Sequence, residues 1–164
     1  MLIRIAESDD AKQLVNLLEQ VENSNFMLFE PGERKISIEQ QRKRIESINE
    51  EGSSTIMVAE DNGLLVGYLF AIGGNPSRAK HAVYLVIGIA ENSRGKGVGT
   101  QLFIKLEEWA KSKGVHRLEL TVMIHNKAGI ALYKKMGFDI EGTKRHSLMI
   151  DGKYIDEYYM SKLL

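Results

Sequence analysis

The segment with the clearest chemical potential is the glycine-rich run Arg94-Gly95-Lys96-Gly97-Val98-Gly99-Thr100. It follows an apolar stretch and opens an amphipathic one, so we expect it to join a strand to a helix. Glycines let the backbone approach a ligand closely, and the first turn of a helix offers unpaired N–H groups at the positive end of its dipole. Arg94 and Lys96 add two cations. The segment therefore predicts a pyrophosphate site.

Two common phosphate-binding patterns do not fit this run. The Walker A pattern needs Gly-Lys followed by Ser or Thr, but Lys96 is followed by Gly97. The third glycine of the dinucleotide pattern would be Thr100 if the pattern began at Gly95, and Leu102 if it began at Gly97. A plain tight turn with solvated basic residues is the other reading, and three glycines in a strand-to-helix junction disfavour it.

The elements that must position this turn alternate between strand and helix patterns. Apolar runs and alternation predict strands at Leu2–Ala6, Thr55–Glu60, Leu64–Ile72, His81–Ala90, Val115–Val122, Phe138–Gly142, Arg145–Ile150 and Lys153–Leu163. Helical spacing predicts helices from about Ala11 to Val21, from Ser37 to Glu50, from Val98 to Ser112 and from Lys127 to Met136. Asp61-Asn62-Gly63 and Asp151-Gly152 are hairpin signals. This order predicts one α/β or α+β domain with a mixed sheet over residues 1–164.

Composition limits the function further. The chain of 164 residues has no Cys, which excludes disulfides, thiolate metal sites and a cysteine nucleophile. Lys+Arg 22 balance Asp+Glu 22, so there is no strongly basic field for nucleic acid. No histidine has a partner three or four residues away, and we expect no metal site at His81, His116, His125 or His146.

No targeting or membrane signal stands out. The start of the chain has no apolar region typical of a signal peptide. The longest apolar stretch, Ala82–Ala90, falls far short of the ~20 residues that cross a membrane. We therefore expect a cytoplasmic protein without a membrane partner.

Two motifs carry a resemblance to a known family. Arg94-Gly95-Lys96-Gly97-Val98-Gly99 matches the Gln/Arg-x-x-Gly-x-Gly/Ala motif of the GNAT family of acetyl-CoA-dependent N-acetyltransferases. The second match is the series Asn126, Ala128, Ile130, Ala131, Leu132, Tyr133, Gly137 and Phe138. Element order extends the resemblance from Leu2 to Leu164. The tail, from Glu141 and from Asp151 to Met160, resembles the branch that acts on free amino acids and similar small amines.

The resemblance implies a fold and a cofactor site. The fold would be a mixed, mostly antiparallel sheet of six to seven strands with about four helices, splayed between strands 4 and 5. Backbone N–H groups of residues 94–100 would hold the pyrophosphate of acetyl-CoA, and Asn126 would contact the cofactor besides capping its helix. The edge of strand His81–Ala90, at Ile87 and Ile89, would pair with the pantetheine arm. An N–H near Ile87 or Gly88 would face the thioester oxygen, and Gly88 suits either a bulge or close packing.

Tyr133 is the expected catalytic acid. It lies seven residues after Asn126 and so on the same helix face. A phenol with a pKa near 10 stays protonated at neutral pH and can donate a proton to the leaving thiolate. The alternative role for Tyr133 is a packed core tyrosine.

The expected general base is Glu119, acting through water. Some relatives that acetylate protein N-termini have a carboxylate where this chain has Thr121, and Glu119 points to the same side of the strand. A surface glutamate is the alternative reading of Glu119. Other candidates for the base are Glu30, His81, Tyr84 and His125.

The expected reaction moves acetyl from acetyl-CoA to a primary amine of an amino acid-like small molecule. Without a cysteine to carry the acyl group, direct attack in a ternary complex is preferred. Alternative acceptors are an antibiotic, a protein N-terminus or a polyamine, for which Glu22, Glu30 and Glu33 offer acidity. A CoA-binding sensor without turnover is the competing class. The run Phe26–Phe29 predicts either a wall of the acceptor pocket or a loop that packs onto the core. The β-hairpin at the end of the sequence has an edge that can pair with a second copy, so a homodimer is a further expectation.

Overall fold

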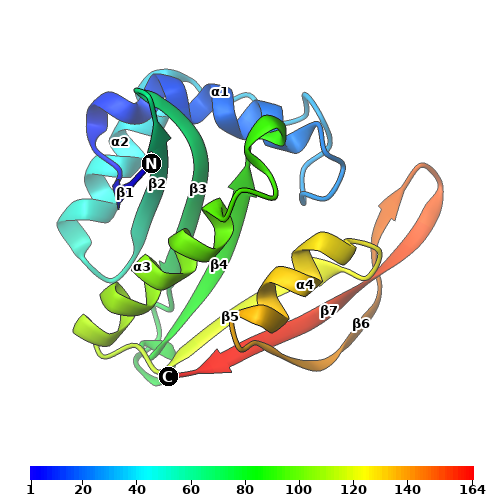
Figure 1. Ribbon diagram of the computed structural model, residues 1–164. Helices are drawn as coiled ribbons and strands as arrows, with labels where there is room; N and C mark the ends of the chain where they lie inside the picture. Colours follow the sequence, from blue (N-terminus) through cyan, green and yellow to red (C-terminus); the bar gives the residue numbers. More distant parts are fainter.

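Seven strands form one mixed sheet in the computed structural model, which describes residues 1–164 (Figure 1). The strand order is β1-β2-β3-β4-β5-β7-β6, and every neighbouring pair is antiparallel except β4 and β5. The strands are β1 (Leu2–Ile5), β2 (Thr55–Asp61), β3 (Leu64–Gly73), β4 (Ala82–Ile89), β5 (Arg117–Met123), β6 (Asp139–Ile150) and β7 (Lys153–Leu163).

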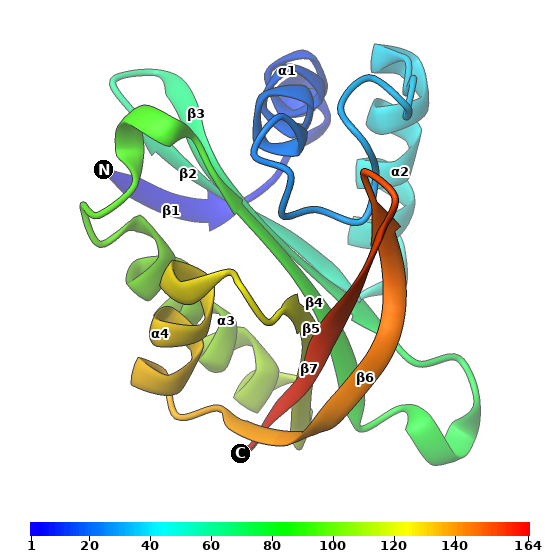
Figure 2. The same cartoon turned by 90° about the vertical axis from the view of Figure 1, so that its right-hand side faces the viewer.

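Four α-helices cover the sheet unevenly. They are α1 (Ala11–Glu22), α2 (Ile38–Glu51), α3 (Val98–Ser112) and α4 (Lys127–Lys135). Helices α1 and α2 lie on one face over strands β1 to β4, whereas α3 and α4 lie on the opposite face (Figure 2). Each face has its own buried hydrophobic cluster, one around α3 and one around α1 and α2. The face of β5, β7 and β6 that turns away from α4 has no helix over it (Figures 1 and 2).

Local sequence signals explain where the elements begin and end. Ser37 caps α2, because its Oγ accepts from the N–H of Gln40 and the Gln40 side chain accepts from the N–H of Ser37. The expected hairpin turns are confirmed: Asn62 and Gly63 have φ of 50° and 79°, and Asp151 and Gly152 repeat the pattern at 50° and 76°. Two consecutive positive φ values favour such tight hairpins.

The fold class expected from the sequence is confirmed, and most element ends fall within two residues of expectation. One difference is β6, which runs without a break from Asp139 to Ile150, although its register with β7 shifts twice. The shifts fall between Ile140 and Gly142 and between Lys144 and Leu148, so the two expected strands form one irregular strand. Ile38, the first residue of α2, is 39 % exposed, whereas Ile45 and Ile48 of the same helix are buried.

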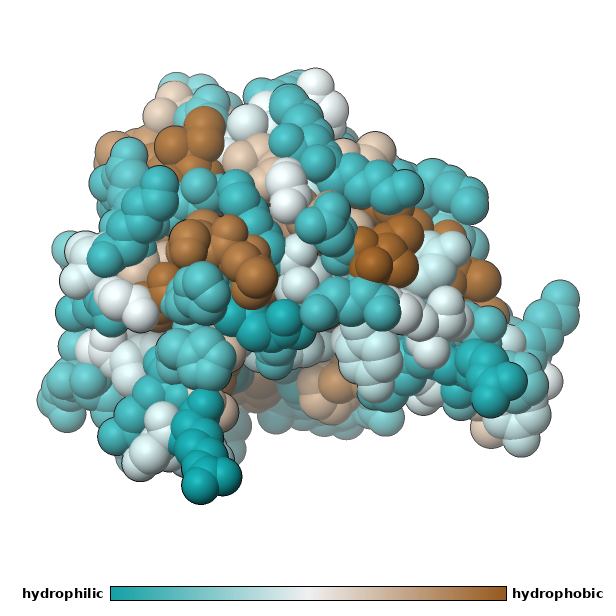
Figure 3. Space-filling view, turned by 90° about the horizontal axis from the view of Figure 1, so that it is seen from below, coloured by the Kyte–Doolittle hydropathy of each residue, from teal (hydrophilic) through white to brown (hydrophobic).

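The face of the molecule seen from below has no single large apolar patch (Figure 3). Seen from below, hydrophobic side chains form separate patches among hydrophilic ones (Figure 3). None of the helices combines the length and the apolar composition that crossing a membrane requires.

Candidate active site

A fork between β4 and β5 is the main irregularity of the sheet. The two strands pair in parallel only from Ala82 with Arg117 to Tyr84 with Glu119. Beyond these pairs the strands separate, as the resemblance implied. Residues 85–89 of β4 therefore have one edge without a neighbouring strand, and their backbone groups on that edge can pair with a bound ligand.

The direction of the backbone groups in β4 decides which residues face the fork. The N–H of Ala90 donates to the carbonyl of Val66 beside β3, and the register between β3 and β4 is unbroken. Backbone groups alternate along a strand, so the N–H groups of Val86 and Gly88 also face β3. Those of Ile87 and Ile89 point into the fork. Of the two positions expected to face a thioester oxygen, Ile87 is the one whose N–H points into the fork.

Gly88 has a packing role: of the two readings that the sequence left open, close packing is the one observed, and the register of β3 and β4 shows no bulge there. A Cβ at Gly88 would lie 2.4 Å from Cζ of Tyr68 and 2.5 Å from its hydroxyl oxygen. Tyr68 stands opposite Gly88 on β3 and is fully buried. A glycine is needed at this position because the tyrosine ring occupies the space where a side chain would be.

The glycine-rich turn forms a cradle of backbone donors. Gly95 and Gly97 have φ of 71° and 81°, which L side chains rarely adopt, and Gly97 is the N-cap of α3. The N–H groups of residues 95–100 donate to no group of the protein. A run of six such donors at a helix N-terminus suits an anionic ligand.

The side chains around this cradle have different roles. Arg94 and Lys96 are exposed, and Arg94 donates from Nε to the carbonyl of Ile89 at 3.3 Å. Lys135 of α4 donates to Oγ1 of Thr100 at 3.2 Å, which places a further cation beside the cradle. Gly99 is buried, and a Cβ there would lie 2.6 Å from Leu132, so its main contribution is close packing of α3 on α4.

Asn126 is confirmed as a helix cap. Its Oδ1 accepts from the N–H of Gly129 at 3.0 Å at the start of α4. A Cβ at Gly129 would lie 2.6 Å from Nδ2 of Asn126, so the cap requires glycine there. The side-chain nitrogen Nδ2 of Asn126 makes no hydrogen bond and remains available to a ligand, whereas its backbone N–H donates to the carbonyl of Met123.

Tyr133 lies on the α4 side of the sheet with 8 % of its surface exposed. Its ring packs edge-on to Phe103 at 5.9 Å and tilted to Phe138 at 6.2 Å. Burial, and to a lesser extent the nearby Tyr84, raises the pKa of Tyr133 above its usual value of 10. No hydrogen bond engages its hydroxyl. Tyr133 is thus a neutral phenol in a largely apolar environment, and its hydroxyl has no hydrogen-bond partner within the protein.

A hollow of about 350 Å³ opens on the opposite face, next to the base of the fork. It is lined by Tyr84, Arg117, Glu119, Leu120, Thr121, Glu141, Tyr159 and Met160. The hydroxyl of Tyr84 and Oγ1 of Thr121 lie 2.8 Å apart, so a hydrogen bond joins β4 to β5 just where the fork begins. A hollow of this volume fits a small molecule.

One arginine organises the charges of this hollow. Arg117 donates from Nε to Glu119 at 2.7 Å and from Nη2 to Glu141 at 2.5 Å. Hydrogen bonds from Arg117, and to a lesser extent Ser161, lower the pKa of Glu141, and the two carboxylates raise the pKa of Arg117. Arg117 therefore stays charged and holds Glu119 beside Thr121.

The remaining candidates for the base lie in different places. Glu30 and His81 are exposed, and His81 lies at the paired end of β4, away from the fork opening. His125 contacts the ring of Phe26 at 5.4 Å between ring centres. That contact links the loop after α1 to the loop before α4. Within the run 26–29 only Met27 packs against the core, so the expected packing of this loop onto the core is confirmed for Met27 alone.

Several residues of the site were not foreseen from the sequence. Tyr159 is opposite Thr121 in the register of β5 and β7. Glu141 reaches Arg117 of β5 from β6, which lies on the other side of β7. The alternation of side chains along β7 could have indicated which face Tyr159 lies on, but not that Thr121 of β5 lies opposite it. No group of three His, Asp or Glu side chains converges as a metal site would require.

Comparison with known proteins gives the same assignment as the fork and the cradle. Residues 12–138 match the family described as "Acetyltransferase (GNAT) family". The L-amino acid N-acetyltransferase AaaT of Escherichia coli (strain K12) is 33 % identical over 111 residues, which cover 65 % of this chain and 67 % of that protein.

Two solved structures are similar over nearly the full chain. The crystal structure of an acetyltransferase of the GNAT family from Streptococcus pneumoniae has a TM-score of 0.95 and 32 % identity, and the match covers 99 % of this chain and 98 % of that one. A putative acetyltransferase, yncA, from Salmonella typhimurium with its cofactor acetyl-CoA has a TM-score of 0.90 at 20 % identity, covering 100 % and 94 %. The chain belongs to the GNAT acetyltransferase family and is an acetyl-CoA-dependent N-acetyltransferase.

Proposed function

We propose that the protein acetylates the amino group of a small, amino acid-like molecule by direct attack on acetyl-CoA in a ternary complex. The observation that carries this proposal is the hollow of about 350 Å³ on the uncovered face of the fork, opposite Tyr133. Its volume suits a small acceptor, and a relative of similar sequence is named for L-amino acids.

The residues present fit acetyl-CoA, which would supply the acetyl group as a thioester. The six free N–H groups of residues 95–100 would hold the pyrophosphate, with Arg94, Lys96 and Lys135 adding positive charge. The backbone of Ile87 and Ile89, directed into the fork, would hold the pantetheine arm. Asn126 would donate its amide N–H from the first turn of α4.

Two groups on opposite sides of the fork would divide the proton transfers. Glu119, held by Arg117 in the hollow, would take the proton of the acceptor ammonium through water. Tyr133, on the other face, would donate its phenolic proton to the departing thiolate, and the N–H of Ile87 would bind the carbonyl oxygen. Burial disfavours the charged form of this phenol, so Tyr133 keeps its proton until a thiolate develops beside it.

A polyamine acceptor receives no support from the acidic residues that suggested it. Arg34 donates to Glu22 from two nitrogens, and Glu22 is 3 % exposed. Glu30 and Glu33 are exposed on the loop after α1. Only two of the three carboxylates are therefore free of an ion pair, fewer than the cluster that suggested a polyamine.

The proposal is tested by measuring thiol release from acetyl-CoA with a panel of L-amino acids, polyamines, aminoglycosides and short peptides. We expect acceptor-dependent release with L-amino acids, and mass spectrometry should show N-acetyl products. Acetyl-CoA binding without release with any amine would instead support a sensor. Release that precedes acceptor addition, with labelled acetyl retained on the protein, would contradict direct attack.

A further inference from the structure

We infer that Arg34 and Arg44 form a subsite for a carboxylate of the acceptor, at the edge of the helical layer beside β4. The inference rests on the proposed function and narrows it to acceptors that carry an anionic group near the reacting amine. It comes from donors that have no acceptor within the protein.

Arg44 is a charged residue without a partner. Its guanidinium carbon lies 5.0 Å above the ring of Phe70, yet Arg44 forms no ion pair and no side-chain hydrogen bond. Its neighbour on α2, Arg42, is paired with Glu39 at 2.7 Å. Arg44 remains accessible to solvent, so a ligand can reach the donors that are not engaged.

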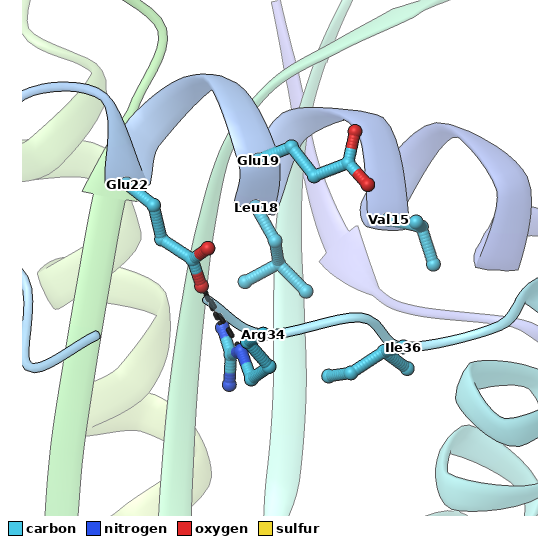
Figure 4. A pocket seen from close by; sticks show the side chains of 6 residues that line it. All are labelled: Val15, Leu18, Glu19, Glu22, Arg34 and Ile36. Carbon is cyan, nitrogen blue, oxygen red and sulfur yellow. Dashed lines mark hydrogen bonds and ion pairs between the residues drawn. The ribbon is translucent and has the colours of Figure 1, made fainter. Parts of the chain in front are cut away.

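Arg34 is only partly engaged. Its Nε and Nη2 both donate to Oε1 of Glu22, at 3.0 and 2.5 Å (Figure 4). Its guanidinium carbon lies 4.6 Å from the ring centre of Phe29. Nη1 makes no hydrogen bond. Glu19 on the same helix points away from this pair (Figure 4). Because Glu22 and Arg34 neutralise each other, the charge of Arg44 remains uncompensated.

Arg44, placed over the ring of Phe70, is affected both by burial and by the charge of Arg34. Partial burial, followed by the charge of Arg34, lowers the pKa of Arg44. Two neighbouring guanidinium groups repel each other unless an anion lies between them. A carboxylate bound to both would remove this repulsion and would use the planar donors of arginine.

The register of the sheet ties this cluster to the fork. Phe70, beneath Arg44, is opposite Val86, and Val86 directly precedes Ile87, whose N–H points into the fork. Tyr68, which packs edge-on to Phe70 at 5.5 Å, is opposite Gly88. The hydroxyl of Tyr68 is buried without a hydrogen-bond partner.

The unused polar groups share one property. Arg44, Nη1 of Arg34 and the hydroxyl of Tyr68 can all donate, and no acceptor of the protein serves them. An acceptor-rich anion is therefore the complementary ligand. A second cationic amine would meet like charge here, which separates an amino acid from a polyamine.

The test compares acceptors that differ only in the carboxylate. L-methionine is paired with 3-(methylthio)propylamine, and L-phenylalanine with phenethylamine, and kcat/KM is measured for each. We expect the wild type to prefer the amino acid. In Arg44→Gln this preference should fall about ten- to hundred-fold, because a charge-assisted hydrogen bond to the carboxylate is lost. Arg42→Gln, two residues earlier on the same helix, should keep the wild-type preference.

A binding experiment gives a second readout. N-acetyl-L-methionine retains the carboxylate, so calorimetry in the presence of CoA should show about ten- to hundred-fold weaker binding to Arg44→Gln and no change for Arg42→Gln. Thermal melting establishes that both variants are folded. Arg34→Lys, which keeps a cation beside Glu22, should lower the preference as well.

The outcomes separate the two proposals. The carboxylate subsite is overturned if the wild type has equal kcat/KM for the amino acid and the descarboxy amine, or if Arg44→Gln keeps the wild-type preference. In either case the proposal that the protein acetylates a small amine stands. Absence of acetylation for every amine of the panel overturns the proposed function and the subsite together.

Discussion

The two faces of the β4–β5 fork are built from different parts of the protein. The α3–α4 face offers mainly backbone donors, from residues 95–100, and a neutral buried phenol, Tyr133. The opposite face offers charged and hydroxyl side chains, such as Glu119 and Thr121, around an open hollow. Backbone groups suit a constant ligand, whereas side chains can vary with the acceptor. The comparison predicts that changes on the first face affect the shared chemistry and changes on the second affect acceptor use.

The largest effect is expected for Tyr133→Phe. Removing the proton donor should lower kcat about a thousand-fold, as loss of a general acid does, while the KM for acetyl-CoA stays the same. Steady-state kinetics at saturating acceptor measures both. Tyr158→Phe is the matched control, because Tyr158 packs against the same core. Similar losses in both variants, or none in Tyr133→Phe, would remove Tyr133 from the mechanism.

Glu119→Gln should lower kcat/KM for the acceptor about a hundred-fold, the smaller end of general-base effects, because its proton transfer runs through water. Glu141→Gln is the control, since Glu141 contacts the same Arg117 and lines the same hollow. Its activity should stay within a few-fold of wild type. An equal loss in both variants would indicate that the charge balance of Arg117 matters and that Glu119 is not the base.

Gly97→Ala should raise the KM for acetyl-CoA about ten-fold with little change in kcat. An alanine at φ 81° is strained by roughly 1 kcal/mol, and relief of that strain would turn the donors of the cradle away from their ligand. Gly114→Ala introduces comparable strain at φ 70° at the far end of α3. Thermal melting should show that both variants lose similar stability. A raised KM in Gly114→Ala as well would mean that stability, rather than the cradle, is being measured.

The same division explains how much the sequence could predict. The cradle and the Asn126–Tyr133 helix each lie within a few consecutive residues, so spacing was enough to identify them. The acceptor face joins Tyr84, Thr121 and Tyr159, which meet because β5 lies between β4 and β7 in the sheet. Short-range patterns in the sequence do not contain that strand order.

Gly88 shows the same limit within the cofactor side. The sequence left a bulge and close packing open, and the choice depends on Tyr68 in the neighbouring strand. The sequence shows that backbone N–H groups alternate along β4, but not which of them face the fork. The hydrogen bond from the N–H of Ala90 to the carbonyl of Val66 decides this. Pairing between strands, rather than local propensity, decides which backbone groups are free.

The smallest effect is expected in the alkaline pH profile of the wild type. Burial raises the pKa of Tyr133 above 10, so the folded protein keeps this phenol protonated at every pH below that value. As the pH rises from 7 to about 9.5, kcat at saturating acceptor should therefore not fall, because the acid is still present and the acceptor amine loses its proton more readily. A decline with a midpoint below pH 9.5 in the wild type, absent from Tyr133→Phe, would show that the phenol ionises too early. Tyr133 would then not be the neutral, buried phenol that the comparison of the two faces assigns to the α3–α4 face.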